Sequence, residues 1–420
     1  MCTKHHKQKK YSLSEFFNSH WDAYVKNPKE PILPEQFKAV NSLLACRTPR
    51  LGTDLYKCPD CDKEREVYHS CRNRFCPTCG YLDTLKWSES IMKKMVNQPH
   101  HHVVVMLPSG FRDLARNNRK LVYSLLMNSA AEAFKEWFKS KWRIEPGIMS
   151  VLHTFGDDKK YHVHVHMILT AGGINKKTGE YKEIDTKKWF VDYSWFCNKK
   201  FQPIFLKYLK RNYKNCKLQH DFSTKDEFEE FLEKEKGKKW RMHIEEPLNN
   251  VEHIVKYIGR YTKRACLSEY KITNIDGEYI SFECKDYKNS TDKKKPKIIE
   301  LKFHYRDFFP RLLQHVPEKY FRTVRYYGLY HWMDKNVPQE LRKKEDEIQT
   351  IKEKELKELE DYESPLICPC CKKKMQYVQT LVDKRKRQNR QWKKYTIPDN
   401  LDLLTIFENE KIKQKCARTV

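Results

Sequence analysis

Two pairs of closely spaced cysteines constrain the fold of this chain more than any other feature. Cys58 and Cys61 form the first pair, in KCPDC, and Cys76 and Cys79 form the second, in FCPTCG. A two-residue gap lets one tight turn present two thiolates to one ion, and two such turns complete the tetrahedral shell of a structural zinc site. We therefore predict that these four cysteines bind one structural Zn²⁺.

Other cysteine and histidine residues leave the ligand set open. The further candidate ligands are Cys46, His69, Cys71, Cys368 and Cys371. The last two belong to the motif ICPCC, which either completes a second zinc site with ligands from elsewhere or holds ordinary thiols. We expect metal ligands rather than disulfides, because disulfide frameworks are typical of small secreted domains.

The charge of the chain predicts a polyanionic partner. Its 83 Lys and Arg residues outnumber 56 Asp and Glu residues, which gives a net charge of +27. We find no run of about 18 apolar residues and no apolar segment behind the basic start, so we expect neither a membrane span nor a signal peptide. A cytoplasmic protein that binds nucleic acid is the resulting prediction. In the cysteine-rich module, Arg72 and Arg74 are the candidate DNA contacts.

Histidines alternate with apolar residues in YHVHVHMILT, residues 161–170. Side chains two positions apart on a strand point to the same face of a sheet. His164 and His166 therefore reach one ion together, while Val165 and Met167 pack on the other side. An exposed polar strand whose histidines coincide by chance is the alternative interpretation.

A second strand-like run precedes this one at residues 150–156, and the polar turn DDKK at residues 157–160 joins the two. This pattern predicts an antiparallel hairpin. The hairpin would bring His153 opposite the histidine strand, where it supplies a third nitrogen. His101 and His102, which open an earlier apolar run, favour a structural role.

A predicted helix at residues 249–264, NNVEHIVKYIGRYTKR, separates apolar and basic residues onto opposite sides. Tyr257 and Tyr261 are four positions apart and lie on one side of this helix, at the seam between the two surfaces. By themselves they resemble ordinary boundary residues. The basic residues, which are candidate DNA contacts, are Lys256, Arg260, Lys263 and Arg264.

Periodicity also predicts the remaining elements. Helices are expected from a cap at Ser12, with Phe16, Phe17 and Trp21 facing a core, and at 82–97, 114–142, 186–238 and 341–362, and strands at 101–108, 240–246 and 298–305. The Asp276–Gly277 pair predicts a hairpin turn. The pair Thr224 and Glu227 predicts a capping box.

Several motifs in order along the chain resemble those of one family. They are ACRTPRLG with SCRNRFCPTCG, VVVMLP, VLHTFG with HVHMILTAGG, KYIGRYTKR, and LLQHVPEKYFRTVRYYGLY. This pattern, over most of residues 40–330, resembles the HUH two-tyrosine rolling-circle transposases of bacterial insertion sequences that carry a zinc-binding N-terminal domain. One departure is His162-Val163, where that family more often has an Asn-Pro-like pair.

The resemblance implies both a fold and site residues. It implies an α+β fold, with an antiparallel sheet flanked by helices, a central histidine strand, the tyrosine helix beside it and an N-terminal helical, zinc-ribbon-like module. His164 and His166 would bind the divalent catalytic ion, Mg²⁺ or Mn²⁺, and Tyr257 and Tyr261 would be the nucleophiles. The implied domains are a helical lead-in at 1–45, a zinc-binding module at 46–97, a catalytic domain at 98–330 and a charged helical, basic C-terminal region at 331–420 that contains CPCC.

The implied activity is that of a nucleoid-associated transposase in a bacterial cytoplasm. It would cut single-stranded DNA at the ends of a mobile element and rejoin it to target DNA through 5′-phosphotyrosine intermediates. A plasmid replication initiator or relaxase with the same chemistry is one alternative, although no phosphate-cradling GxxxxGK[ST] motif is present. A catalytically inactive zinc-dependent DNA-binding protein is another.

Overall fold

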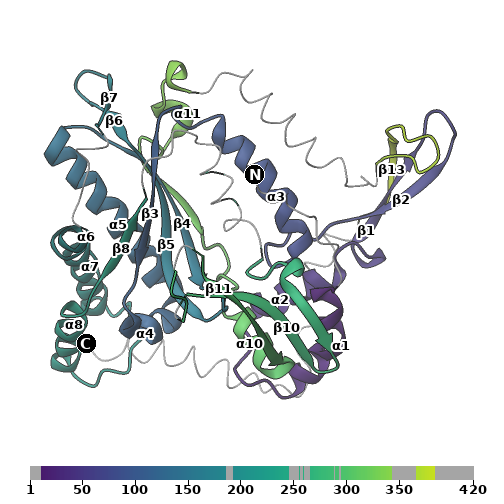
Figure 1. The fold of residues 1–420 in the computed structure, drawn as a ribbon, viewed down its shortest axis with the longest axis horizontal. Coiled ribbons are helices and arrows are strands. Elements are labelled where there is room, and N and C mark those ends of the chain that lie inside the picture. The colour runs from purple at the N-terminus through teal and green to yellow at the C-terminus, as the bar shows by residue number, and fades with distance from the viewer. Residues whose placement is uncertain are drawn as a thin grey trace. The chain divides into compact units, whose positions relative to one another are not determined.

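The described residues form two compact units, each assembled from separate parts of the chain. The computed structural model describes residues 11–185, 193–245, 255, 259, 265–287, 289–292, 295–342 and 366–383. The first unit draws its described residues from Met1–Asp83, Lys263–Val316 and Asp346–Glu410, and the second from Thr84–Thr262 and Pro317–Glu345. Figure 1 shows the labelled elements. The units do not coincide with the four consecutive domains expected from the sequence, because segments distant in the chain share one core.

In the first unit, two N-terminal helices pack with a three-stranded antiparallel sheet of order β11-β10-β9 and one later helix. These elements are α1 (Leu13–Lys26), α2 (Pro34–Ala45), β9 (Ile272–Asp276), β10 (Tyr279–Asp286), β11 (Lys297–His304) and α10 (Tyr305–Leu313). The aromatic face of α1 is buried as expected, and Phe17 stacks on Phe309 with 4.2 Å between ring centroids. The β9–β10 turn at Asp276–Gly277 also forms as predicted, with Gly277 at φ 52°.

A second antiparallel sheet of the first unit has the order β13-β1-β2. Its strands are β1 (Gly52–Lys57), β2 (Glu64–Tyr68) and β13 (Gln376–Asp383). The pairing of β1 with β13 runs from Gly52 opposite Asp383 to Lys57 opposite Gln376. The C-terminal segment therefore completes a sheet that the N-terminal hairpin begins.

The second unit contains a five-stranded antiparallel sheet of order β12-β4-β5-β3-β8. Its strands are β3 (His100–Met106), β4 (Gly147–Phe155), β5 (Tyr161–Thr170), β8 (Arg241–Ile244) and β12 (Val324–Gly328). β4 and β5 form the predicted hairpin, and the histidine strand β5 is central. This arrangement confirms the expected mixed fold of antiparallel sheet and helices.

One face of this sheet packs against helices in an apolar core. Val103, Val105, Val165 and Met167 point into this core, and each is at most 1% exposed. The helices of the unit are α4 (Arg112–Asn117), α5 (Arg119–Trp142), α6 (Tyr193–Phe196), a π-helical segment (Cys197–Phe201), α7 (Gln202–Lys214), α8 (Lys225–Lys236) and α11 (Met333–Asn336). Val165 and Met167 thus pack on the side away from the histidines, as the alternation predicts.

The shorter elements complete the description. They are α3 (Pro77–Met92), the hairpin strands β6 (Gly172–Ile174) and β7 (Tyr181–Glu183), and the 3₁₀ turns Pro49–Leu51, Ser109–Phe111, Glu269–Lys271 and Gln339–Leu341. Within the described ranges, no helix combines the length and apolar character needed to cross a membrane.

Polar side chains explain where two predicted helices are interrupted. The helix expected at 114–142 breaks at Asn118, whose side-chain amide donates to the carbonyl oxygens of Leu114 and Gln219. The region expected to be helical at 186–238 stops after α7 and restarts at α8. There the Thr224 hydroxyl accepts from the Glu227 backbone N–H at 3.2 Å, as in the predicted cap.

The C-terminal helix expected at 341–362 lies almost entirely outside the described residues. The helix expected at 249–264 is described only at Val255 and Gly259, and both are helical.

The buried start of β3 predicts acid sensitivity of the second unit. Burial lowers the pKa of His100 to about 4, and it also lowers the pKa of His101 to about 4. Between about pH 6.5 and 4 the folded chain therefore binds fewer protons than the unfolded chain, so stability falls as the pH falls through this window. The loss is at most about 3 kcal/mol per group. Urea unfolding in the presence of a chelator, followed by fluorescence at several pH values, measures it.

His100→Gln provides the control for this prediction. A glutamine side chain does not titrate, so the variant should lose less stability between pH 6.5 and 4 than the parent. A parent free energy of unfolding that stays constant across this range would contradict the proposed role of buried neutral histidines.

Candidate functional site

Three histidines of the second unit gather on the sheet face opposite the apolar core. His153 pairs directly with His164 across β4 and β5, and His166 follows two positions later on β5. The three potential ligand nitrogens lie within 4.8 Å of one another. The ring centroids of His153 and His166 are 4.2 Å apart. The register of one hairpin thus brings together all three histidines expected at a metal site.

A hydrogen bond determines which ring nitrogen of His164 carries the proton and which one keeps a lone pair. Its Nδ1 lies 3.0 Å from the carbonyl oxygen of His162. A carbonyl oxygen only accepts hydrogen bonds, so Nδ1 carries the proton and Nε2 keeps its lone pair. Nε2 of His164 is therefore the atom available to a metal.

A contact between Glu245 and His102 and a hydrogen bond between His102 and His166 have the same effect on His166. Oε2 of Glu245 lies 3.0 Å from Nδ1 of His102, and Nε2 of His102 lies 2.8 Å from Nδ1 of His166. The carboxylate beside Nδ1 of His102 favours the proton on that nitrogen, and in this tautomer Nε2 of His102 accepts from the Nδ1–H group of His166. This sequence of donors leaves the Nε2 lone pair of His166 for a metal, an arrangement common behind metal-binding histidines.

The sequence pattern favours a structural role for His102 and does not single out Glu245. His102 and Glu245 join the site only through strand pairing, because β3 lies between β5 and β8. The Glu245 backbone N–H donates to the His102 carbonyl oxygen at 2.9 Å, directly after β8 ends. A histidine on a strand next to the histidine strand is the one sequence signal that points to this partner.

Burial keeps the imidazoles of His164 and His166 neutral. Desolvation lowers the pKa of His164 to about 3 and lowers that of His166 well below its ordinary value. At neutral pH, protons therefore do not compete with a metal for their lone pairs.

The two tyrosines expected as nucleophiles, Tyr257 and Tyr261, lie outside the described residues. So do the basic residues of the same segment, Lys256, Arg260, Lys263 and Arg264. Within residues 249–264, the structure describes only Val255, which is fully buried, and Gly259.

Gly259 makes a close contact with α3. Its carbonyl oxygen accepts from the Thr84 hydroxyl at 3.2 Å. A Cβ atom on Gly259 would lie 2.7 Å from Oγ of Ser88 and 3.6 Å from the indole of Trp87. A larger residue here would force the side chains of Ser88 and Thr84 to shift.

Strand register places Gly259 on the histidine side of the sheet. The Trp87 side chain, adjacent to Gly259, hydrogen-bonds the hydroxyl of Tyr326. Tyr326 on β12 pairs with Met149 on β4. Because Met149 is four positions before His153 on one strand, both side chains share a face.

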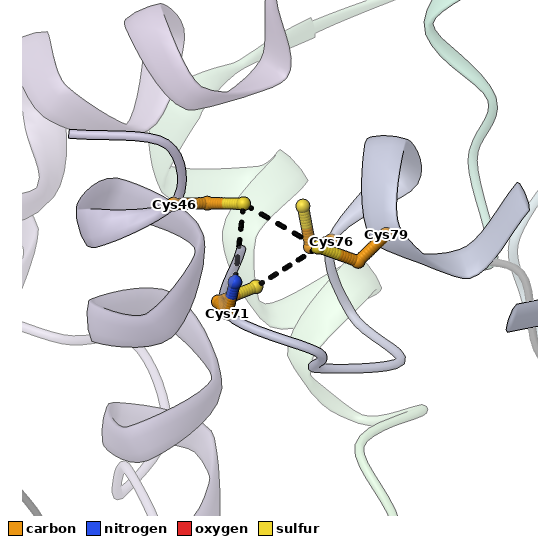
Figure 2. Close-up of side chains that lie close together, drawn as sticks. All are labelled: Cys46, Cys71, Cys76 and Cys79. Carbon is orange, nitrogen blue, oxygen red and sulfur yellow. Dashed lines mark hydrogen bonds between the residues drawn. The ribbon is translucent and has the colours of Figure 1, made fainter. Parts of the chain in front are cut away.

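Four cysteines of the first unit form one compact group (Figure 2). Cys46 follows α2, Cys71 follows β2, and Cys76 and Cys79 lie at the start of α3. The sulfur of Cys79 is 3.4 Å from that of Cys46 and 3.6 Å from that of Cys71. Hydrogen bonds from the other three thiols hold the pKa of Cys79 well below its usual value. Four thiolates at such distances match a tetrahedral zinc site.

A second group consists of Cys58, Cys61, Cys368 and Cys371. The single zinc site expected at Cys58, Cys61, Cys76 and Cys79 is thus divided between two groups in the structure. The β1–β2 hairpin is the reason, because it carries the first pair at its tip and the Cys46–Cys71 contact at its base. Backbone N–H groups of Cys371 and Cys370 lower the pKa of the Cys368 thiol to about 6.

The remaining candidate residues of this module differ in accessibility. His69 belongs to neither group, since its ring bonds the Leu51 carbonyl oxygen at 3.0 Å and the Asp54 carboxylate at 2.8 Å. Arg72 is exposed, whereas Arg74 is half-buried. Burial lowers the pKa of Arg74 to about 10, which still leaves it charged at neutral pH. Of the two, Arg72 is the more accessible candidate for DNA contact.

Two family models match this chain, and both describe transposases. A model described as a putative transposase matches residues 147–338, the range that contains the three clustered histidines. A model described as a transposase zinc-binding domain, of the IS91 type, matches residues 16–107.

Two curated relatives are similar over most of their length. A putative transposase of Sinorhizobium fredii, y4qJ, is 27% identical over 323 residues, which are 75% of this chain and 79% of that protein. The transposase for insertion sequence element IS801 of Pseudomonas savastanoi pv. phaseolicola is 27% identical over 297 residues, 70% of each chain. No solved structure matches. The chain thus matches a putative transposase family over residues 147–338 and an IS91-type transposase zinc-binding domain over residues 16–107.

Proposed function

We propose that this transposase is a metal-dependent HUH endonuclease and strand transferase that acts on single-stranded DNA. In this proposal it cuts the ends of a mobile element, forms 5′-phosphotyrosine intermediates and rejoins the strand to target DNA in a rolling-circle process. The observation that carries the proposal is the histidine cluster, because the hydrogen bonds of His164 and His166 both leave Nε2 lone pairs for one ion.

The donor set fits a divalent catalytic cation. The nitrogens of His153, His164 and His166 would hold Mg²⁺ or Mn²⁺, and such an ion polarises a scissile phosphate when bound. Three imidazoles leave room in the coordination shell for oxygen ligands. Glu245 and His102 would keep the His166 ring in its binding tautomer.

The tyrosines supply the nucleophile in this scheme. The hydroxyl oxygen of Tyr257 or Tyr261 attacks phosphorus, a phosphotyrosyl bond forms, and the 3′-oxygen leaves and takes up a proton. The new ester retains the bond energy, so a different 3′-hydroxyl can displace the tyrosine and join strands without ATP. A second tyrosine allows another cut while the first strand stays attached.

Basic residues of both units would bind the DNA backbone. The proposed phosphate contacts are Arg72, Arg74, Lys256, Arg260, Lys263 and Arg264. The net charge of +27 supports a polyanionic substrate. Structural zinc, held by Cys46, Cys71, Cys76 and Cys79, would fix the loop that presents Arg72.

We predict that Tyr257→Phe combined with Tyr261→Phe abolishes covalent protein–DNA adducts. Phenylalanine keeps the ring but lacks the attacking oxygen, so folding and DNA binding should change little. Adducts with a single-stranded oligonucleotide are measured on denaturing gels in Mg²⁺ or Mn²⁺. Tyr320→Phe, at a tyrosine that is 84% exposed, serves as the control and should keep wild-type adduct yield.

The outcomes separate the proposed chemistry from its alternatives. An adduct formed by the double phenylalanine variant would place the nucleophile elsewhere. A wild-type chain that binds the oligonucleotide but never cleaves it would instead indicate a catalytically inactive DNA-binding protein.

We predict that His102→Ala and Glu245→Gln each weaken Mn²⁺ binding by about 10- to 100-fold, because the ring of His166 loses its orienting partner. Electron paramagnetic resonance of free Mn²⁺ measures this affinity without any cleavage assay. His243→Gln changes an exposed ring beside Glu245 and should bind Mn²⁺ normally. Equal affinities in all three variants would rule out orientation through this chain.

We predict that Cys71→Ser releases one zinc ion and unfolds the loop between β2 and α3. Binding at structural zinc sites contributes about 10–16 kcal/mol of apparent free energy, so a lost ligand is not tolerated locally. Zinc content by mass spectrometry and proteolysis at this loop are the measurements. Cys216→Ser, at an exposed cysteine outside both groups, should change neither result. Full zinc content in Cys71→Ser would remove Cys71 from the ligand set.

A further inference from the structure

We infer that Cys58, Cys61, Cys368 and Cys371 form a second structural zinc site, which fastens the C-terminal segment 366–383 to the β1–β2 hairpin. The two matched family models cover residues 16–107 and 147–338, so two of these four cysteines lie beyond both. The site is independent of the proposed cleavage chemistry.

The distances between the sulfurs fit a four-thiolate zinc site. The sulfur of Cys371 is 3.3 Å from that of Cys58 and 3.9 Å from that of Cys61, and the Cys61 and Cys368 sulfurs are 3.5 Å apart. Thiolates that bind zinc at about 2.3 Å in a tetrahedron lie about 3.8 Å from each other. A disulfide would need about 2.05 Å, and all four cysteines are free thiols here.

The two cysteine pairs sit in turns with the same backbone structure. The Cys58 N–H donates to the Lys63 carbonyl oxygen at 2.9 Å, and the Cys368 N–H donates to the Lys373 carbonyl oxygen at 2.8 Å. Each bond spans five residues, and in both turns the residue after the second cysteine has a positive φ, 55° and 60°. Two separate segments thus adopt one conformation that presents paired sulfurs to a common point.

Charge and burial around the sulfurs also suit a metal. Four thiolates with one Zn²⁺ carry a net charge of −2, which nearby lysines would offset. An ion pair of 3.0 Å between Lys373 and Asp60 joins the two turns. Cys58 and Cys368 are fully buried and pack with Met375. A closed shell of four thiolates has no open position, so its role is structural rather than catalytic.

Among the described residues, β13 is held by backbone pairing with β1, a hydrogen bond from Thr380 to Asp54 and a ring contact of Tyr377 with Tyr56. Its pairing with β1 ends at Lys57 opposite Gln376, one residue before Cys58 (Figure 1). Tyr377, Val378 and Leu381 remain 56%, 48% and 42% exposed, so the strand buries little apolar surface. Strand pairs that bury little apolar surface are only marginally stable by themselves. A shared zinc ion supplies the missing stabilisation.

The test counts zinc in the full chain by native mass spectrometry. His164→Ala and His166→Ala are present in every sample, so that the histidine cluster adds no ion. We expect two zinc ions in this parent and one after Cys368→Ser with Cys371→Ser. Cys370→Ser is the matched control, because Cys370 lies in the same turn, is exposed and belongs to neither group. It should retain two ions.

Alkylation of the thiols in the same samples separates ligand loss from general unfolding. In the parent, Cys58 and Cys61 should resist the reagent. In the Cys368→Ser, Cys371→Ser variant they should react at least tenfold faster, although they lie more than 300 residues away, while Cys79 stays protected by its own group.

Three results would overturn the inference. They are one zinc ion in the parent, continued protection of Cys58 in the double serine variant, and recovery of the four cysteines as zinc-free disulfides from protein purified under reducing conditions.

Discussion

The two-sided character of β5 is the constraint on which the second unit depends. Val165 and Met167 are fully buried against helices on one face, and His164 and His166 lie on the other. A slip of one residue in register would move every side chain to the opposite face, placing imidazoles in the apolar core. The packing that stabilises the sheet therefore also fixes the site. Stability and geometry of the histidine cluster cannot be altered independently at this strand.

Local periodicity explains how much of this arrangement could be predicted from the sequence. Alternation identified β5 and its faces, a short polar turn identified the hairpin, and the register then placed His153 opposite His164. His102 and Glu245 escaped prediction because their contacts need the order of three strands whose connections are long. No local pattern encodes that β3 lies between β5 and β8, and without this order the His102 ring looks like any buried histidine.

For the cysteines, the sequence identified the pairs but not which pairs share a metal site. A two-residue gap correctly marks sulfurs that share one turn, but it does not identify the partner of each turn. The β1–β2 hairpin separates Cys58 at its tip from Cys71 beyond its base, so neighbouring pairs in the chain fall into different groups. The tip then meets a turn of matching conformation more than 300 residues later. Backbone similarity between the two turns, visible only in three dimensions, is what pairs them.

The exposure of Glu245 explains how the buried histidines keep a defined tautomer without a buried charge. Its side chain is 47% exposed, whereas that of His102 is only 3% exposed. The carboxylate thus stays hydrated, which avoids the large desolvation cost of an ion in the interior. Its pKa is lowered, first by the hydrogen bond with His102, so it remains an acceptor at neutral pH. Through the imidazole of His102, a surface carboxylate favours the proton on Nδ1 of His166, and the rings of His164 and His166 then present lone pairs on the buried face.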